Sequence, residues 1–168
     1  MKRVIALALV ILMAFALAAR AESYDDQLIR QIDYYFTMTR DELIETLGPD
    51  YEDVAAGPEG VCDGYYYEEL GLIFAFYPDD DILEMIDCAP EFKIYGVGAG
   101  SLLSEVAEAL GETEIIETWV ETPDHPAYMV RYILGDSDYR FISFEKDGPV
   151  DIFYIISAIY MFEEEEVY

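Results

Sequence analysis

Basic residues are scarce in this chain. It has 9 Lys and Arg side chains against 36 Asp and Glu side chains in 168 residues, a formal net charge of −27. Three of the nine lie within the first 20 residues, so residues 22–168 carry 6 basic and 36 acidic side chains, a net charge of −30. Binding to the nucleic-acid backbone requires clustered Lys and Arg, so this balance excludes it, and the same balance argues against docking on anionic lipid. A negative field of this size favours a cationic partner.

Histidine is almost absent. A catalytic triad needs a histidine that a third group holds in place, and a zinc site normally needs several His or Cys ligands. The one histidine, His125, lies in the proline-rich stretch "TPDHPAY". We therefore expect His125 to be an ordinary surface residue, and we expect neither a zinc site nor a cofactor.

Cysteine is nearly as rare, since Cys62 and Cys88 are the only two. In an exported chain two cysteines favour a disulfide, which we predict here. Two separate buried thiols are the alternative. A plain three-stranded meander over residues 65–88 would leave the two residues at opposite edges, about 20 Å apart. A bridge needs Cα atoms within about 7 Å, so the loop at residues 57–63 would have to fold back.

The beginning of the chain has the features of a signal peptide. "MKRVIALALVILMAFALAARA" contains two basic residues, an apolar run and a small-x-small cleavage motif. The apolar run is short for a membrane anchor, which is the alternative, because a span needs about 20 residues. No cysteine follows for lipid attachment. We predict cleavage after residue 21 and a secreted or extracytoplasmic mature protein with no membrane contact.

Helical patterns with capping residues occur three times. With 54% hydrophobic and 15% aromatic residues, the chain is a folded one and not a disordered acidic chain. Ser23 with Asp26 predicts the start of a helix over residues 24–36. The stretch "TRDELIETLG" (residues 39–48) begins with a Thr–Glu capping box and ends at a glycine.

The phrase "SLLSEVAEALG" (residues 101–111) repeats this capped helix later in the chain. Here we expect Ser101 to be the N-cap and Gly111 to end the helix. Three apolar residues at helical spacing are expected to face inward, namely Leu102, Val106 and Leu110.

After each of these helices the apolar period changes to 2, as in strands. In "YYYEELGLIFAFY" two strands flank a turn at Glu69–Gly71, and "ILEMID" is the returning strand. In the second half we expect strands over residues 127–134 and 139–145, over "VDIFYIISAIYM", and over "EIIETWVE". The bridging stretch "PEFKIYGVGAG" is expected to be an ordered strand and turn.

The predicted fold class is α+β, with two tandem modules that each pack a short capped helix, or a helix pair, on an antiparallel meander. The predicted boundaries are residues 1–21 for the signal peptide, 22–92 for the first module and 93–168 for the second. The second module ends in the acidic tail "EEEEVY", which we expect to be solvated.

These modules resemble a known family. "KIYGVGAGSLLSEVAEALGE" and "YYYEELGLIFAFYPDDDILEMI" are similar to the helix-then-sheet modules of exported bacterial proteins built like beta-lactamase inhibitor protein. Small outer-membrane assembly lipoproteins share this module type. The resemblance covers most of residues 36–160 and implies a binder without catalytic chemistry, which grips other proteins with its open sheet face and loops.

The chain departs from this family in two ways. The inhibitor family has a disulfide in each module, whereas this chain has cysteines in the first copy alone. The assembly lipoproteins are anchored through a cysteine that is missing here. No interface residue matches position by position, so we do not expect inhibition of a beta-lactamase.

Tyrosines on the predicted strands are the candidate binding residues. Tyrosine suits a half-buried sheet, and it is also enriched at binding hot spots. Tyr65 and Tyr67 share one side of their strand, and Tyr128 and Tyr132 share one side of theirs. We expect one of these pairs to face outward. The predicted function is therefore a secreted, non-enzymatic binding protein with a protein partner, which we expect to be basic.

Two other functions fit the composition. A small extracytoplasmic carbohydrate-active hydrolase would use a pair of acids about 5–10 Å apart, which 36 acidic residues produce by chance. A wall-associated structural protein would bind calcium at residues 79–81 or 136–138. Neither stretch has the spacing of a calcium loop, and both lie where a hairpin turn needs short polar residues.

Overall fold

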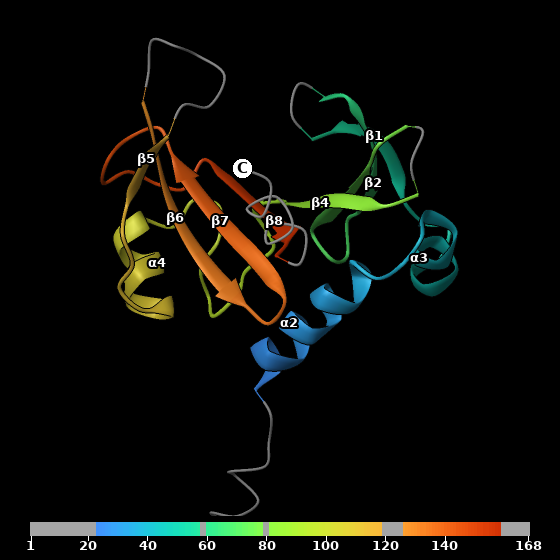
Figure 1. Ribbon diagram of the computed structural model, residues 1–168, viewed down its shortest axis with the longest axis horizontal. Coiled ribbons are helices and arrows are strands. Elements are labelled where there is room, and N and C mark those ends of the chain that lie inside the picture. The colour runs from blue at the N-terminus through green and yellow to red at the C-terminus, as the bar shows by residue number, and fades with distance from the viewer. Residues whose placement is uncertain (1–22, 58–59, 79–80, 119–125, 159–168) are drawn as a thin grey trace, which may run out of the picture.

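The computed structural model describes residues 23–57, 60–78, 81–118 and 126–158. This part of the chain forms three helices and one eight-stranded antiparallel sheet, with the strand order β1-β2-β3-β4-β8-β7-β6-β5 (Figure 1). The fold class is α+β, as predicted from the sequence. The predicted signal peptide at residues 1–21 lies outside the described residues.

Apart from β1, which was not predicted, the elements follow the predicted order along the chain. The helices are α2 (Tyr24–Tyr35), α3 (Arg40–Leu47) and α4 (Leu103–Leu110). The strands are β1 (Glu52–Ala56), β2 (Cys62–Tyr67), β3 (Leu72–Phe76), β4 (Leu83–Cys88), β5 (Ile116–Thr118), β6 (Ala127–Leu134), β7 (Ser137–Ser143) and β8 (Ile152–Ser157).

Local sequence explains the first two helices. The Ser23 hydroxyl accepts a hydrogen bond from the Asp26 amide at 3.1 Å, and the Asp26 carboxylate accepts one from the Ser23 amide at 3.3 Å. Thr39 and Glu42 form the same reciprocal box at the start of α3. Gly48 ends α3 with a φ of +92°, which favours glycine. Both predicted caps are confirmed.

The predicted cap of α4 is wrong by one residue. The N-cap is Leu102, whose amide donates to the Glu105 carboxylate at 2.8 Å. The Ser101 hydroxyl instead accepts a hydrogen bond from the Gly98 amide at 3.2 Å, and this bond stabilises the turn before the helix. Leu102 is therefore exposed, and Leu103 takes the inward position next to Val106.

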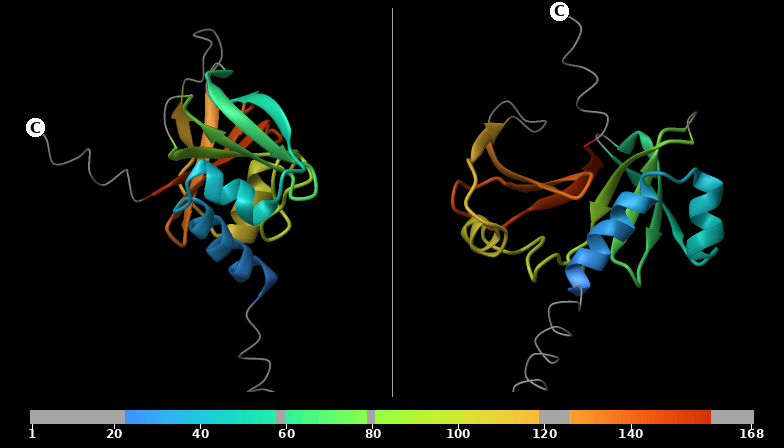
Figure 2. Two further views of the ribbon diagram at one scale, coloured as in Figure 1. Left: turned by 90° about the vertical axis from the view of Figure 1, so that its right-hand side faces the viewer. Right: turned by 60° about the horizontal axis from the view of Figure 1, so that its bottom comes forward.

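All three helices contribute to one core on the same side of the sheet, and the left-hand view of Figure 2 shows α2 below strands β1–β4. Ile32 of α2, Leu43 of α3 and Val106 of α4 are completely buried. They belong to a single core cluster with strand residues from both halves of the chain, such as Phe74 and Phe141. Burial of this cluster is the main source of stability, at roughly 25 cal/mol per Å² of apolar surface.

The two halves of the chain share one sheet. β8 lies in the middle and pairs with β4 on one side and β7 on the other. This position explains why the sequence of β8 is apolar on both faces. Among the described residues no helix is long and apolar enough to cross a membrane.

Both halves contain a unit of one helix followed by four strands, and in the first half α2 precedes this unit. One hydrogen bond also occurs in both. The hydroxyl of Tyr67 in β2 donates to the carbonyl of Gly48 at 2.9 Å, and the hydroxyl of Tyr132 in β6 donates to the carbonyl of Gly111 at 2.7 Å. Each bond ties the end of a helix to the second strand that follows it.

Candidate functional site

The four candidate tyrosines lie on the helix-covered side of the sheet. Tyr65, Tyr67 and Tyr132 are each at most 9% exposed, and Tyr128 is partly buried against the same core. The expectation that one of the two pairs faces outward is wrong. Their strand positions alternate in step with the core phenylalanines, so the helices cover them too. These tyrosines pack in the core and do not form an exposed aromatic face.

The opposite side of the sheet, called here the open face, carries the other alternating set of side chains. Ladder pairing places one residue from each of six neighbouring strands in a continuous line. All six are partly exposed. This open-face row consists of Tyr66, Ile73, Asp87, Tyr154, Arg140 and Arg131.

Charged groups are held tightly at one end of the row. Asp138, whose side chain is completely buried, accepts from Arg131 Nη2 at 2.7 Å and from Arg140 Nε at 2.8 Å. Arg140 also donates to the Tyr154 hydroxyl at 3.2 Å, and its guanidinium lies 5.7 Å from the centre of that ring. Burial lowers the pKa of Arg140, but its bonds to Tyr154 and Asp138 raise it overall. Two cations therefore share one anion.

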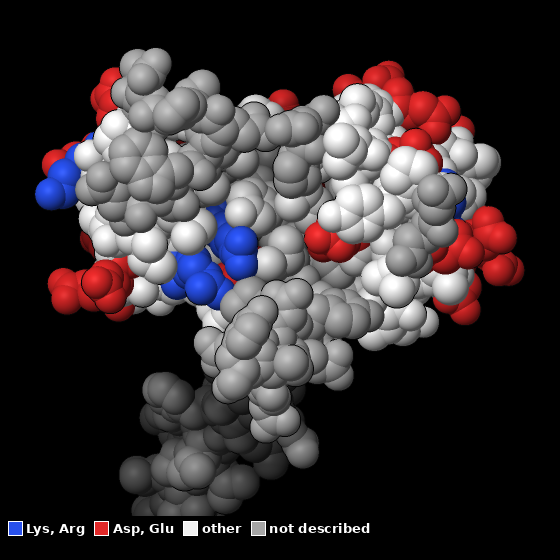
Figure 3. Space-filling view, turned by 45° about the horizontal axis from the view of Figure 1, so that its top comes forward, with Lys and Arg blue, Asp and Glu red and all other residues white. Residues whose placement is uncertain are grey.

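This arrangement is unusual for so acidic a chain. With the top of the molecule brought forward, Figure 3 shows one group of blue basic side chains in the left half and another at the left edge, with red acidic side chains at both edges and near the centre. The Arg131 and Arg140 side chains are 31% and 21% exposed, so solvent reaches both.

Asp87 is the acidic member of the row. Its carboxylate accepts a hydrogen bond from the Gly57 amide at 3.4 Å. Burial raises the pKa of this carboxyl above its ordinary value, and the Gly57 bond lowers it by less. Carboxyl groups with a shifted pKa occur often at functional sites, and also in purely structural positions.

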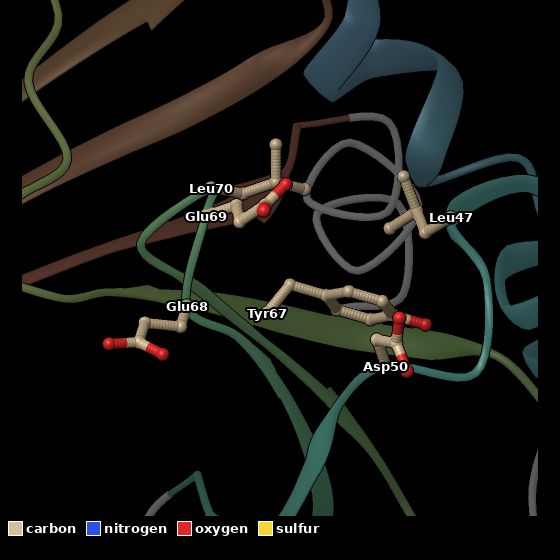
Figure 4. Close-up of a pocket in the computed structure, with 6 residues that line it drawn as sticks. All are labelled: Leu47, Asp50, Tyr67, Glu68, Glu69 and Leu70. Carbon is tan, nitrogen blue, oxygen red and sulfur yellow. The ribbon is translucent and has the colours of Figure 1, made fainter.

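The second candidate is an acid-rimmed pocket beside the β2–β3 turn, with a volume of about 370 Å³. Figure 4 shows the Tyr67 ring between the turn and Leu47 at the end of α3, and Asp50 lines the same pocket. Burial raises the pKa of Tyr67 to about 12, so the phenol stays neutral. The lining residues are Leu47, Asp50, Tyr67, Glu68, Glu69 and Leu70.

A further pocket of about 340 Å³ lies against the same turn and shares Glu69 and Leu70. It extends toward α2, where Tyr24 is 76% exposed. The two pockets together surround the turn with acidic, aromatic and leucine side chains. The remaining lining residues are Tyr24, Leu28, Gln31, Tyr35, Leu72, Glu91, Phe92 and Lys93.

Cys62 and Cys88 are both free and buried, so the predicted disulfide is wrong in this structure. Cys88 packs in the helix-covered core, whereas Cys62 packs with Ala75 and Met85 on the open face. The residues therefore lie on opposite sides of the sheet and on strands that β3 separates. Their thiols cannot meet without breaking the register of the sheet.

The structure also limits the metal and histidine candidates. Asp138 is engaged by two guanidinium groups, which opposes calcium binding at residues 136–138. Within residues 23–57, 60–78, 81–118 and 126–158, no group of three or more His, Cys, Asp or Glu side chains is placed to hold a metal ion. His125 and residues 79–80 lie outside the described residues.

Part of the open face could be predicted from the sequence. Alternation predicts that about half of the strand tyrosines point away from the helices, and Tyr66 and Tyr154 are two of these. No local signal marks Asp138 as the centre of an arginine pair, because its partners are set by the β6–β7 register.

Comparisons with known proteins add little to this picture. No family model matches the chain, and no curated protein does. The crystal structure of a DUF4309 family protein, YjgB from Bacillus subtilis subsp. subtilis str. 168, is similar with a TM-score of 0.42 and 18% sequence identity. The match covers 71% of this chain and 78% of that one. A likeness at this level carries no argument about function.

Proposed function

We propose that this protein is a secreted, non-enzymatic binding protein whose partner is a basic protein that inserts a lysine or arginine side chain into the acid-rimmed pocket. One observation carries the proposal: three carboxylate-bearing residues, Asp50, Glu68 and Glu69, line a cavity together with a tyrosine ring and two leucines. Of the tyrosines first expected to form an aromatic sheet face, Tyr67 supplies the ring of this pocket, whereas Tyr65, Tyr128 and Tyr132 do not line it.

The pocket suits a long cationic side chain. The methylene stem of lysine packs against leucine while its charged end stays near the rim, as amphipathic side chains commonly do. A cation within about 6 Å of an aromatic ring gains roughly 0.5–1 kcal/mol at an exposed site. Exposed ion pairs add about 0.2–1 kcal/mol each. These are small gains, so lasting affinity requires burial of Leu47 and Leu70 as well.

Long-range charge supports the same partner. Residues 22–168 carry a net charge of −30, which accelerates encounter with a cationic protein. The Debye length is about 8 Å at physiological ionic strength, so added salt should slow association steeply. The salt dependence of association reports only the net charge of the whole chain and not the place of contact. Pocket variants are needed to locate the contact.

We further propose that the chain consists of two tandem modules, residues 22–92 and 93–168. The repeated order of one helix and four strands supports this division, and so do the matching bonds from Tyr67 to Gly48 and from Tyr132 to Gly111. The β4–β8 ladder would then be the contact between the modules.

The proposal is tested by a pull-down from the envelope of the producing organism, with the chain from Glu22 as bait. A pocket variant combines Asp50→Asn, Glu68→Gln and Glu69→Gln. A control variant of equal net charge combines Glu108→Gln, Glu112→Gln and Glu114→Gln, three exposed residues at and after α4. We expect a basic partner that binds the parent and the control at least tenfold better than the pocket variant.

Equal losses with both variants would mean that bulk charge alone attracts the partner, and the pocket would be ruled out as the site. Turnover of a carbohydrate by the purified chain, abolished by a single carboxylate substitution, would favour the hydrolase. Asp87 has a raised pKa, as a catalytic acid would. Its hydrogen-bond partner is the Gly57 amide, however, and not the second carboxyl group that a hydrolase needs.

A further inference from the structure

Strand β1 ends the sheet and leaves one backbone edge without a partner strand. On one side β2 pairs with all five residues of β1, and among the described residues no strand pairs with it on the other side. The strand contains no proline, so every residue has an amide. In an antiparallel ladder about half of the amide and carbonyl groups of an edge strand point away from its neighbour. β1 therefore offers these groups to a further strand.

The other end of the sheet is a poorer place for strand addition. β5 has three residues, whereas β1 has five, so a ladder on β1 contains more hydrogen bonds. The middle of β1 also carries small side chains. Val54 is partly exposed and Ala55 is exposed. A partner strand can approach the backbone there without displacing a large side chain.

The charged side chains of β1 are acidic on both sides of the sheet. The ladder pairs Glu52 with Tyr66 on the open face and Asp53 with Tyr65 on the helix-covered side. Both acids are exposed, and no Lys or Arg of the described residues forms an ion pair with either. A strand added to β1 therefore meets a carboxylate whichever way its own side chains point.

This charge selects what binds the edge. Opposite charges on neighbouring strands stabilise a sheet, and like charges destabilise it. A second copy of this chain would bring its own acidic β1 and a further net charge of −30 from residues 22–168, so it is repelled. Charged edge strands commonly prevent pairing between copies in this way. A segment rich in lysine or arginine is attracted instead.

The edge leads directly to the acid-rimmed pocket. Asp50, which lines that pocket, lies two residues before β1. The pairing of Glu52 with Tyr66 brings the start of β1 beside the end of β2, and the pocket residues Glu68 and Glu69 follow β2. An extended chain advances about 3.3 Å per residue, so a partner strand that runs past Glu52 reaches the pocket within about two residues.

We propose that a basic segment of the partner adds to β1 as an extended strand and inserts one lysine or arginine side chain into the acid-rimmed pocket at the start of β1. In this mode of recognition main-chain hydrogen bonds supply affinity, and a side-chain pocket supplies selectivity. The inference rests on the proposed function, because it describes how the proposed basic partner is held.

The test is hydrogen exchange, followed by NMR, on the chain from Glu22 at constant low ionic strength. The probe is a seven-residue peptide of alternating lysine and threonine with both ends blocked. In the free chain the β1 amides that do not pair with β2 should exchange fast, and saturating peptide should slow them about tenfold or more. The same peptide N-methylated at every residue keeps its charge but has no amide donors. It should bind about fivefold more weakly or worse and protect none of these amides.

Two proline substitutions block the edge without changing any charge. Neighbouring amides of a strand point to opposite edges, so Val54→Pro and Ala55→Pro remove one amide that pairs with β2 and one that points away from it. Proline is tolerated in an edge strand where the amide faces solvent, and thermal unfolding shows which variant keeps the fold. That variant should bind the lysine–threonine peptide about fivefold more weakly than the parent does, or worse.

A pair of charge variants gives a second measurement that needs no proline. Glu52→Gln with Asp53→Asn removes the two acids of β1, and Glu112→Gln with Glu114→Gln removes two exposed acids far along the chain. Both variants have the same net charge. The β1 variant should bind the peptide about threefold more weakly than the control variant does, because only its acids lie beside the added strand. Equal weakening would show that net charge alone attracts the peptide.

The pocket variant of Asp50, Glu68 and Glu69 separates this inference from the proposed function. If it binds the peptide more weakly while the folded proline variant binds like the parent, strand addition is wrong and the pocket stands. The reverse pattern would support strand addition and rule out the pocket. Equal binding of the two peptides, or protection confined to strands other than β1, would also overturn strand addition. Protection of β1 that rises with protein concentration in the absence of peptide would identify a second copy as the occupant and contradict the inference.

Discussion

The hydroxyl of Tyr132 donates a hydrogen bond of 2.7 Å to the carbonyl of Gly111, the residue that ends α4. The carbonyls in the last turn of a helix have no partner within the helix, and the chain around them needs anchoring. This bond fixes the exit of α4 against β6, two strands later in the chain. Because Tyr132 is buried, few alternative partners exist for its hydroxyl group.

Removal of this hydroxyl group should destabilise the protein. Tyr132→Phe keeps the ring and loses one hydrogen bond, which should cost about 1 kcal/mol and lower the melting temperature by roughly 2–4 °C. Tyr67→Phe should behave alike. Tyr66→Phe on the open face is the control and should stay within about 0.5 kcal/mol. Equal changes in melting temperature in all three variants would mean that the bonds to Gly48 and Gly111 contribute no more to stability than the exposed Tyr66 hydroxyl does.

Gly135 lies against α2 in the β6–β7 turn, and its substitution should be costly. Its φ is +63°, and an added Cβ would clash with the Asp33 carboxylate. That carboxylate accepts from the Asp136 amide at 3.1 Å and from the Ser137 hydroxyl at 2.6 Å. We expect Gly135→Ala to cost about 2–4 kcal/mol in denaturant unfolding, the sum of backbone strain and overpacking.

Gly96→Ala separates the two contributions. Gly96 has a φ of +81° and nothing within 4 Å of an added Cβ, so its substitution should cost about 1–2 kcal/mol from backbone strain alone. A Gly135→Ala variant no less stable than Gly96→Ala would contradict the close approach of α2 to this turn.

Asp87 should make stability depend on pH. Burial raises its pKa above the ordinary value of 3.8, so the folded protein holds this proton more tightly than the unfolded chain does. The contribution to stability is complete below the ordinary pKa and is lost as pH rises through the folded pKa. Asp87→Asn keeps an oxygen for the Gly57 amide and should raise the melting temperature at neutral pH.

This gain should shrink toward about pH 4, where the parent carboxyl group is becoming protonated as well. Melting temperatures of parent and variant across the pH range provide the measurement. A difference that does not depend on pH would show that desolvation of the charge is not the cause.

The two thiols should react only after unfolding. Cys62 and Cys88 are 3% and 8% exposed, and burial raises the pKa of both thiols. In the unfolded, unreduced protein we expect two titratable thiols, and in the native protein slow reaction at both. A reduced sample gives the reference count. No free thiol before reduction would mean that a bridge forms and that the described register of the sheet is not the native one.

Local signals in the sequence predict the helices and hairpins well. The capping pairs at Ser23 and Thr39 and the glycine at residue 48 act within a few residues, so their effect is visible in the sequence. β1 was not predicted, because "EDVAA" has no apolar alternation. It forms as an edge strand through its pairing with β2. β7 begins at Ser137 and not at residue 139, because its first residues are fixed by α2 and the ladder.

By itself the sequence determined the α+β class, the N-caps of α2 and α3, the turns, and the two alternating sides of each predicted strand. It did not determine which side the helices cover. That depends on contacts among Ile32, Leu43, Val106 and strands distant in sequence, and these contacts placed Tyr65 and Tyr67 in the core and Tyr66 outside. The arginine pair around Asp138 likewise exists only through the register of β6 and β7, because shifting that register by one residue would turn these side chains to the other face.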